Sequence, residues 1–144
     1  MAYIVGLITA DGCLSNDGRH IIFVSKDLEQ VQNFSNILKL EGKIALKKGG
    51  YTGRKEYYFV QFSNVNLYRF LVSLGLHPNK SKSLGKLSIP DDYFADFLRG
   101  CLDGDGFTYS YLDKRWRSSF MLYTGFTCAS YDHLNWMNES IYRL

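Results

Sequence analysis

Two short stretches of this 144-residue chain are near copies of each other, and each ends in Asp-Gly. Residues 5–12 read VGLITADG, and residues 99–106 read RGCLDGDG. In each stretch small residues recur four positions apart, bulky apolar residues fill the gaps, and an acid follows at once. Because residues four apart lie on one face of a helix, each stretch predicts a short helix with a nearly flat stripe. Two such stripes allow the helix backbones to approach unusually closely.

The acids that follow the stripes are the leading candidates for a functional site. The predicted helix interface consists of Gly6, Ala10, Gly100 and Gly104. Contact along this interface brings Asp11 and Asp105 together at one end. Paired carboxylates supply the hard oxygen ligands that Mg²⁺ prefers. A single Asp-Gly would be an ordinary helix-ending turn, whereas two in matching frames favour a magnesium site between the two acids.

Composition limits the function classes further. An apolar content of 46% with 22% charged residues predicts one packed domain. Three cysteines without a C-x-x-C pattern indicate a reducing compartment. The sequence shows no signal peptide and no apolar run of membrane-spanning length. We therefore expect an intracellular, non-secreted protein. The net charge is only +3, but basic residues gather in loops and hairpins, which is typical of DNA-binding surfaces and also of solvated ones.

Hydrophobic periodicity predicts alternating helices and strands. Helices are expected over 3–12, over 26–40 with Ser25 as the cap, over 67–74 ending at Gly75, over 91–104, and from Ser130 onward. Strands are expected over 12–16, 20–24, 43–48, 56–63, 107–112 and 120–130. The three histidines, His20, His77 and His133, share no ligand spacing and are expected in a strand, in a loop and on a helix surface.

The repeated motif resembles that of the LAGLIDADG family of homing endonucleases and maturases. Matching auxiliary segments are Ser25-Lys26-Asp27-Leu28, its second copy at 130–134, and Asn79-Lys80-Ser81 followed by Ile89-Pro90 and residues 97–100. The resemblance implies an α+β fold of αββαββα repeats, paired by a pseudo-two-fold axis, with the motif helices at the centre and a sheet saddle that binds DNA. We expect a first unit at 1–90 and a partial second unit at 91–144.

The resemblance also implies site residues and a divalent cofactor, Mg²⁺ or Mn²⁺. Asp11 and Asp105 would bind the metal, helped by the carbonyls of Ala10 and Gly104. Lys80 would polarise the phosphate or simply contact the DNA backbone, and Gln61 is a weaker candidate for ordering water. The predicted partner is double-stranded DNA, and the predicted contacts are Arg19, Lys47, Lys48, Arg54, Tyr57, Gln61, Lys82, Lys114, Arg115 and Arg117.

The sequence is compatible with three functions. The leading one is a site-specific, Mg²⁺-dependent DNA endonuclease, intron-encoded or free-standing, or a fragment of one. The alternatives are a cleavage-inactive nucleic-acid-binding relative, either an RNA maturase or a transcription regulator, and an endonuclease domain embedded in an intein. Because the second unit lacks a second hairpin, we expect the chain alone to bind DNA weakly, cut little, and self-associate through that incomplete unit, with Leu134, Met137 and Ile141 on the face to be covered.

Overall fold

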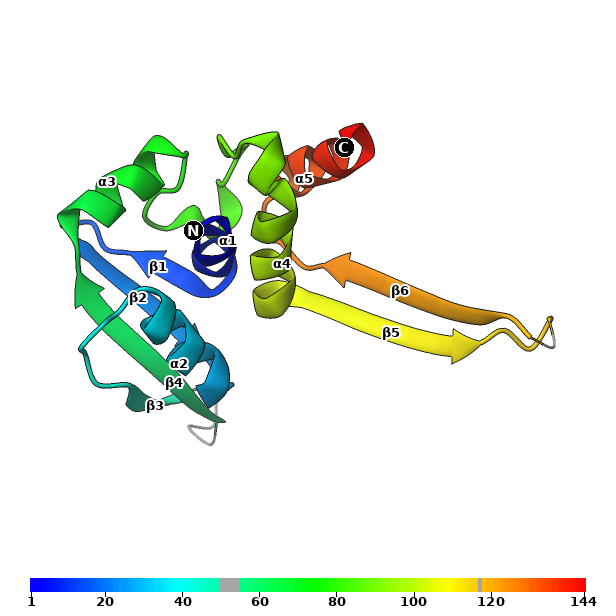
Figure 1. Ribbon diagram of the computed structural model, residues 1–144, viewed down its shortest axis with the longest axis horizontal. Coiled ribbons are helices and arrows are strands. Elements are labelled where there is room, and N and C mark those ends of the chain that lie inside the picture. Colours follow the sequence, from blue (N-terminus) through cyan, green and yellow to red (C-terminus); the bar gives the residue numbers. More distant parts are fainter. Residues whose placement is uncertain (50–54, 117) are drawn as a thin grey trace.

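Two helices stand side by side at the centre of the molecule, with a sheet on each side of them (Figure 1). The computed structural model describes residues 1–49, 55–116 and 118–144. The central helices are α1 (Ala2–Asp11) and α4 (Phe94–Asp105), which are the two repeated stretches of the sequence. The predicted α+β arrangement with paired motif helices is therefore confirmed.

The first unit has the expected αββαββα order. A four-stranded antiparallel sheet follows α1, with the spatial order β1-β2-β4-β3. Its strands are β1 (Gly12–Leu14), β2 (His20–Ser25), β3 (Ala45–Gly49) and β4 (Lys55–Ser63), and its other helices are α2 (Leu28–Ile37) and α3 (Val65–Ser73). The tip of the predicted hairpin between β3 and β4 lies outside the described residues. Gly75 has φ of 107° just after α3, a left-handed conformation that suits glycine at a helix end.

One face of this sheet is covered and the other is open. Alternation along the strands turns Ile21, Phe23 and Val60 toward α2, where all three are fully buried. The ring of Phe34 in α2 stacks on Phe23, with ring centroids 4.3 Å apart. The opposite face carries the residues that alternate with these. We call it the open face; it consists of Cys13, His20, Ile22, Val24, Lys47, Tyr57, Phe59, Gln61 and Ser63.

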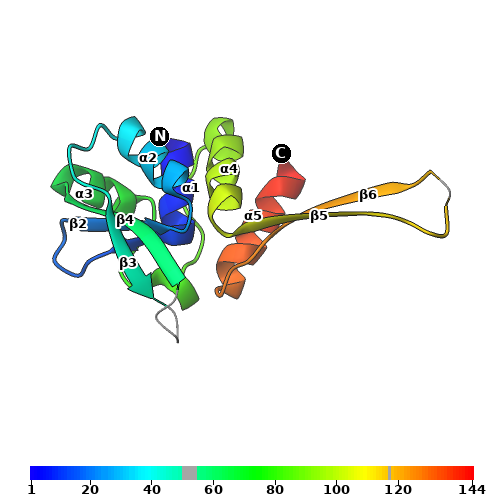
Figure 2. The same ribbon diagram turned by 90° about the horizontal axis from the view of Figure 1, so that it is seen from below.

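The second unit is shorter, with the order αββα. After two short 3-10 turns, η1 (Lys80–Lys82) and η2 (Asp91–Tyr93), the helix α4 leads into β5 (Gly106–Leu112) and β6 (Phe120–Phe126). These two strands form a separate two-stranded sheet that extends away from the helix pair, as Figure 2 shows from a second direction. The last helix, α5 (Tyr131–Arg143), begins after Ser130, whose side chain caps it as predicted.

The sequence-based bounds of two elements need correction. The helix predicted over 26–40 is shorter, because Asp27 rather than Ser25 caps it: the Asp27 side chain accepts from the Glu29 N–H at 2.9 Å. The Ser25 hydroxyl instead accepts from the Asp27 N–H. The strand predicted to reach residue 130 ends at Phe126, since Ser130 is needed as the cap of α5.

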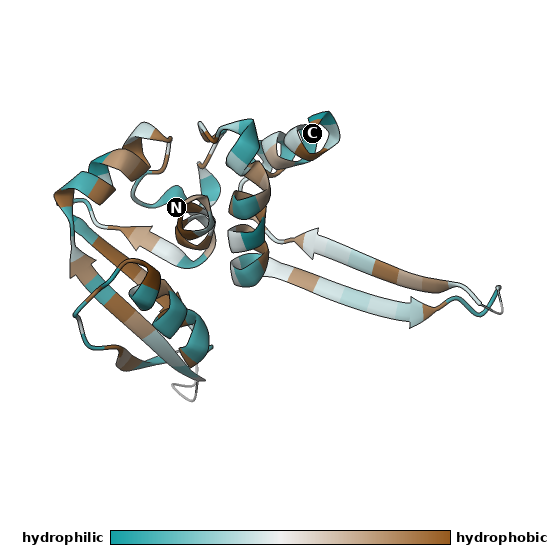
Figure 3. Cartoon of the chain, viewed as in Figure 1, coloured by the Kyte–Doolittle hydropathy of each residue, from teal (hydrophilic) through white to brown (hydrophobic). Residues whose placement is uncertain are grey.

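Hydropathy follows this architecture (Figure 3). The helix α1 is apolar along most of its length and buried from Ile4 to Thr9. In contrast, α2, α4 and α5 each bury only one face. In α5 the buried face contains His133, Trp136, Met137 and Ser140, while Ile141, which belongs to the face predicted to need a cover, is 45% exposed. Within the described residues, no helix is long and apolar enough to cross a membrane.

Candidate metal and nucleic-acid site

The site begins with the contact between α1 and α4, which leaves no room for side chains. A Cβ added to Gly6 would lie 2.2 Å from the Phe97 carbonyl oxygen, and one added to Gly100 would lie 2.1 Å from the Tyr3 carbonyl oxygen. One helical turn further on, a Cβ on Gly104 would lie 2.4 Å from the Cβ of Ala10. The residues predicted as the helix interface thus lie in the interface, and the helices run side by side in the same direction.

This parallel contact brings the two acids to the same end of the helix pair. A Cβ on Gly104 would lie 3.3 Å from Oδ2 of Asp11, so the Asp11 carboxylate reaches across to the end of α4. The pKa of Asp11 is raised to about 6, first by burial and then by the negative charge of Asp105. Burial also raises the pKa of Asp105. Two carboxylates therefore face each other in a partly desolvated position.

Lys80 supplies the positive charge beside this pair. It is only 6% exposed, and its Nζ donates a hydrogen bond of 2.5 Å to the carbonyl of Gly12, the residue after Asp11. Burial lowers the pKa of Lys80, while Cys13, Asp105 and Asp11 raise it in part. Asn79 holds the preceding backbone in the left-handed region, with φ of 58°, which asparagine tolerates well. Because Lys80 is buried, its side chain lies next to the acids rather than on the surface.

The donor set suits a divalent cation of the magnesium type. Asp11 and Asp105 offer hard oxygen atoms, and the carbonyls of Ala10 and Gly104 adjoin them in the chain. The raised pKa of Asp11 reflects its burial first and then the negative charge of Asp105, and a bound cation would offset both. Among the described residues no group of three His, Cys, Asp or Glu side chains gathers in one place. Mg²⁺ commonly uses only one or two carboxylates, with water and phosphate oxygens as the remaining ligands, so the two acids are sufficient.

Asp103, the earlier acid of the second motif, has a structural role. Its carboxylate accepts a hydrogen bond of 2.9 Å from the hydroxyl of Tyr3, across the helix contact. Its carbonyl accepts a hydrogen bond of 2.5 Å from the side chain of Gln30 in α2. The first bond joins α1 to α4, and the second joins α4 to α2. Thr9, the matching residue of the first motif, is buried, and its hydroxyl donates to the carbonyl of Val5.

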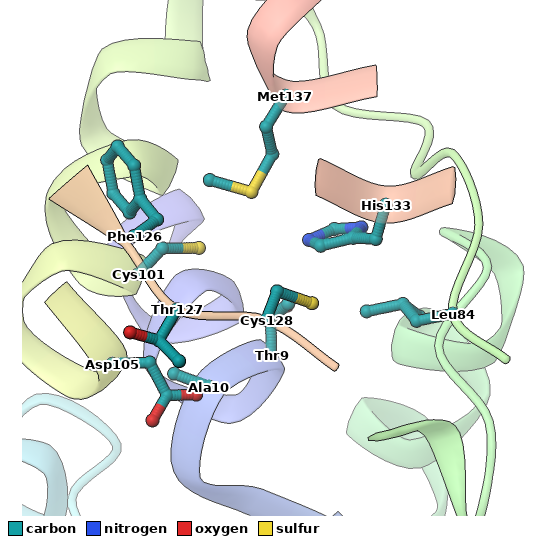
Figure 4. Close-up of a pocket in the computed structure, with 10 residues that line it drawn as sticks. All are labelled: Thr9, Ala10, Leu84, Cys101, Asp105, Phe126, Thr127, Cys128, His133 and Met137. Carbon is teal, nitrogen blue, oxygen red and sulfur yellow. The ribbon is translucent and has the colours of Figure 1, made fainter. Parts of the chain in front are cut away.

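A cavity of about 30 Å³ lies behind Asp105, between α1, α4 and α5 (Figure 4). Such a volume holds about one water molecule. His133 lines this cavity and is 2% exposed, so the expectation that it lies on a helix surface is wrong. Its Nδ1 donates to the carbonyl of Gly85 at 2.9 Å, and its Nε2 finds no partner among the described residues. The pKa of His133 is lowered, mainly by burial and in part by the charge of Lys80.

The open face of the first sheet begins beside the acids. Cys13 pairs with Ile22, and Ile22 pairs with Gln61, so one cross-strand row runs from the end of the Asp11 helix to Gln61. Gln61 therefore lies two strands from Cys13, about 10 Å at the usual strand spacing. The structure does not bring it together with the two acids. Gln61 is instead exposed on the open face, beside the half-buried Ile22 and Phe59.

Lysines and one tyrosine gather at the far end of the open face. Lys47 pairs with Tyr57, and the Nζ of Lys26 lies 5.9 Å from the centre of the Tyr57 ring. Sequence reasoning missed Lys26 because the residue was assigned to the predicted α2, whereas it follows β2 directly. Lys48 pairs with Glu56, so its side chain leaves the opposite side of the strand from that of Lys47.

The other predicted DNA contacts are scattered. Arg19 lies in the turn before β2, where its Nε is 3.6 Å from the Asp17 carboxylate. Lys82 is exposed at the end of η1, and Lys114 is exposed at the tip of the β5–β6 hairpin. Arg115 at the same tip is held by the nearly buried carboxylate of Asp113, at 2.7 Å. Arg54 and Arg117 lie outside the described residues.

The second sheet carries aromatic residues on the face that corresponds to the open face. Gly106 pairs with Phe126 just as Gly12 pairs with Phe23, so Phe107 and Gly125 correspond to Cys13 and Ile22. Alternation then places a cluster of three tyrosines on the corresponding face, with ring centroids 5.4–6.1 Å apart: Tyr109, Tyr111 and Tyr123. The sequence could have indicated this cluster through the alternation of Tyr109 and Tyr111 in β5.

Comparison with known proteins places the chain in a family. The LAGLIDADG-like domain model matches residues 1–75. A comparison with curated proteins gave no match. Among solved structures, the meganuclease I-SmaMI bound to uncleaveable DNA is 16% identical, with a TM-score of 0.48 over 85% of this chain and 64% of that one.

Two structures of the homing endonuclease I-DmoI are also similar. A structure from a study of its mesophilic variants is 18% identical, with a TM-score of 0.41 over 73% of this chain and 56% of that one. The complex of I-DmoI with DNA and Mn is 16% identical, with a TM-score of 0.41 over 79% of this chain and 69% of that one. The chain thus spans less than two thirds of the I-SmaMI structure and of the I-DmoI variant. The domain match covers more than half of the sequence, and the chain therefore belongs to the LAGLIDADG family.

Proposed function

We propose that this chain is a site-specific DNA endonuclease, or the part of one that holds the reacting centre. The observation that carries the proposal is the meeting of Asp11 and Asp105 at the end of a helix contact with no room for side chains, beside the buried Lys80. Two partly buried carboxylates that repel each other raise the energy of the unliganded protein. A helix pair needs no such pair of acids for its stability, so their position favours a role in binding a cation.

A divalent cation bound there would lower the pKa of a water molecule and neutralise charge on the phosphate. The chain's own residues would hold the cation and contact the phosphate. Asp11 and Asp105 would supply oxygen ligands from two different helices, and the helix contact would set the separation of these ligands. Lys80 would direct its Nζ toward the phosphate, and the bond to the Gly12 carbonyl holds this atom in place.

DNA would lie along the open face of the first sheet and the tyrosine cluster of the second. On the open face, Lys26 and Lys47 flank Tyr57 and would contact phosphates, which strengthens binding without selecting a sequence. Gln61 and Ser63 offer polar side chains that can reach base edges in the major groove. The second sheet has two strands where the first has four, so we expect weak binding and slow cleavage by the chain alone.

The decisive experiment is cleavage of a randomised DNA library, followed by sequencing of the cut ends. We expect discrete double-strand breaks at a recurring sequence with Mg²⁺ or Mn²⁺, and none with Ca²⁺. Asp11→Asn and Asp105→Asn should each abolish the breaks and leave DNA affinity within a few-fold. The matched control is Asp103→Asn, which keeps an oxygen acceptor for the Tyr3 hydroxyl and should still cut.

The same experiment separates the alternative function. A maturase or transcription regulator with this fold would bind nucleic acid and produce no metal-dependent breaks. Enrichment of one sequence by binding, without cut ends under any metal, would replace the proposed endonuclease with this binding role. Equal cutting by the wild type and by Asp11→Asn would remove the site assignment.

A further inference from the structure

The backbone of the β5–β6 hairpin leaves one row of donors and acceptors free. The Asp113 N–H donates to the Ser119 carbonyl at 2.9 Å, and the Thr127 N–H donates to the Asp105 carbonyl at 3.1 Å. Bonded pairs alternate along an antiparallel ladder, so the odd-numbered residues of β6 face β5. The even-numbered ones, Phe120, Leu122, Thr124 and Phe126, direct their N–H and C=O groups to the opposite edge. Within the described residues, no strand pairs with that edge.

In the first unit, the edge that corresponds to the free edge of β6 is paired with another strand. Since Gly12 pairs with Phe23 and Gly106 pairs with Phe126, β6 corresponds to β2. In the first sheet β2 is an inner strand, and its second edge is paired with β4 over six residues. The outer edge of β1, by contrast, is free, and this is the edge to which the outer edge of β5 corresponds. The fold therefore has a place for a further strand beside β6 and none beside β5.

The side chains of β6 are mostly apolar and all uncharged, as is typical of an inner strand of a sheet. Phe120 and Leu122 are 63% and 66% exposed, on the same side of the hairpin as the partly buried Phe126. The strand β6 contains no charged residue and no proline, whereas the edge strand β3 carries Lys47 and Lys48. Natural edge strands are commonly protected from pairing by lysine or proline. An uncharged edge of seven residues lacks this protection.

We propose that β6 pairs edge to edge with β6 of a second copy of this chain. A two-fold axis at Tyr123 sets the pairs Leu122–Thr124 and Phe120–Phe126, each formed twice, so all four outward residues of each strand find partners. The absence of charge in β6 means that this antiparallel self-pairing brings no like charges together. An isologous contact of this kind closes on itself and gives a dimer rather than a fibre.

The same register places apolar side chains where the first unit has them. In the first unit, Val60 lies opposite Phe23 and Phe62 lies opposite Ile21, with Phe34 of α2 packed against Phe23 and Phe62. In the proposed pair, Phe120 and Leu122 of the second copy take the positions of Val60 and Phe62. They would enter the groove between β6 and α5, which is lined by Phe126, Leu134, Met137 and Ile141. The partner thus covers a surface that is otherwise left open.

A matched pair of proline variants tests the proposal. Thr124→Pro removes an N–H that faces the free edge of β6 and no bond within the hairpin. Thr108→Pro does the same at the free edge of β5, because Thr108 lies directly opposite Thr124. Sedimentation velocity over a wide concentration range should show dimers for the wild type and for Thr108→Pro, and monomers for Thr124→Pro. Circular dichroism and thermal unfolding verify that both variants fold.

Amide hydrogen exchange of the wild type gives a test that needs no variant. The amides of Leu122 and Thr124 should exchange slowly at high protein concentration and faster on dilution, while those of Thr108 and Ser110 should exchange fast throughout. A wild type that stays monomeric at all concentrations overturns the proposal. Fast exchange at Leu122 and Thr124 in a dimeric sample also overturns it, since the dimer would then use another surface.

Discussion

Asp11, at the end of α1, is expected to lower the stability of the metal-free protein. Asp11 carries a raised pKa of about 6 because it is partly buried and faces Asp105. Its ionisation near neutral pH therefore opposes folding. After a reduction for solvent screening, the shift corresponds to about 1–2 kcal/mol. Asp11→Asn should stabilise the metal-free protein by this amount in urea unfolding with a chelator present. Asp103→Asn serves as the control with little change, and a destabilised Asp11→Asn would refute the repulsion.

His133 gives the protein a pH dependence of a definite sign. Its pKa is lowered in the folded state, mainly by burial and in part by Lys80, so the unfolded state takes up a proton first as the pH falls. The stability that depends on neutral His133 is present above the unfolded pKa of about 6.5 and is lost as the pH falls below it. Between about pH 7.5 and pH 5.5, the wild type should lose about 1 kcal/mol more than His133→Gln in urea unfolding. Equal losses would show that His133 titrates normally.

The helix contact is the element on which the site depends. A Cβ on Gly100 would overlap the Tyr3 carbonyl oxygen, which belongs to a rigid helix backbone and cannot rotate away. Gly100→Ala should therefore destabilise the protein by about 2–4 kcal/mol, and Gly100→Leu should prevent the helices from docking. Gly85→Ala is the control, because a Cβ there meets nothing within 4 Å. Thermal unfolding measures both variants. Equal melting temperatures for Gly100→Ala and Gly85→Ala would mean that the helices can move apart without a loss of stability.

Elements were more predictable from the sequence than their contacts. Sequence patterns indicated every α-helix and the longer strands of the described residues, because local patterns determine local structure. The short β1 was expected only from the order of elements in the unit, and the two 3-10 turns were not predicted. The repeated motif also gave the two acids and the interface glycines. The cap at Asp27 was missed because Ser25 is an equally good capping residue, and only the end of β2 decides between them. The position of Lys26 over Tyr57 depends on strand register, which no local pattern contains.

At the scale of the whole molecule, the two sheets form the surface that would receive DNA. Each phosphate neutralised by a lysine contributes about one unit to the slope of log affinity against log salt concentration. Lys47→Gln should lower the slope by about this amount, because Lys47 lies on the open face. The neighbouring Lys48→Gln, on the other side of the strand, should change it less. Fluorescence anisotropy with duplex DNA at several salt concentrations measures both slopes, and equal changes would argue against binding by the open face.

The central claim is that Asp11 and Asp105 together bind a divalent cation, and it can be measured directly with Mn²⁺. Electron paramagnetic resonance follows free Mn²⁺ as protein is added in the presence of duplex DNA. We predict that the wild type and Asp103→Asn bind Mn²⁺. For Asp11→Asn and Asp105→Asn, we predict a bound fraction no higher than that of DNA alone. If both Asn variants bind Mn²⁺ as well as the wild type does, the metal lies elsewhere and the assignment of Asp11 and Asp105 is contradicted.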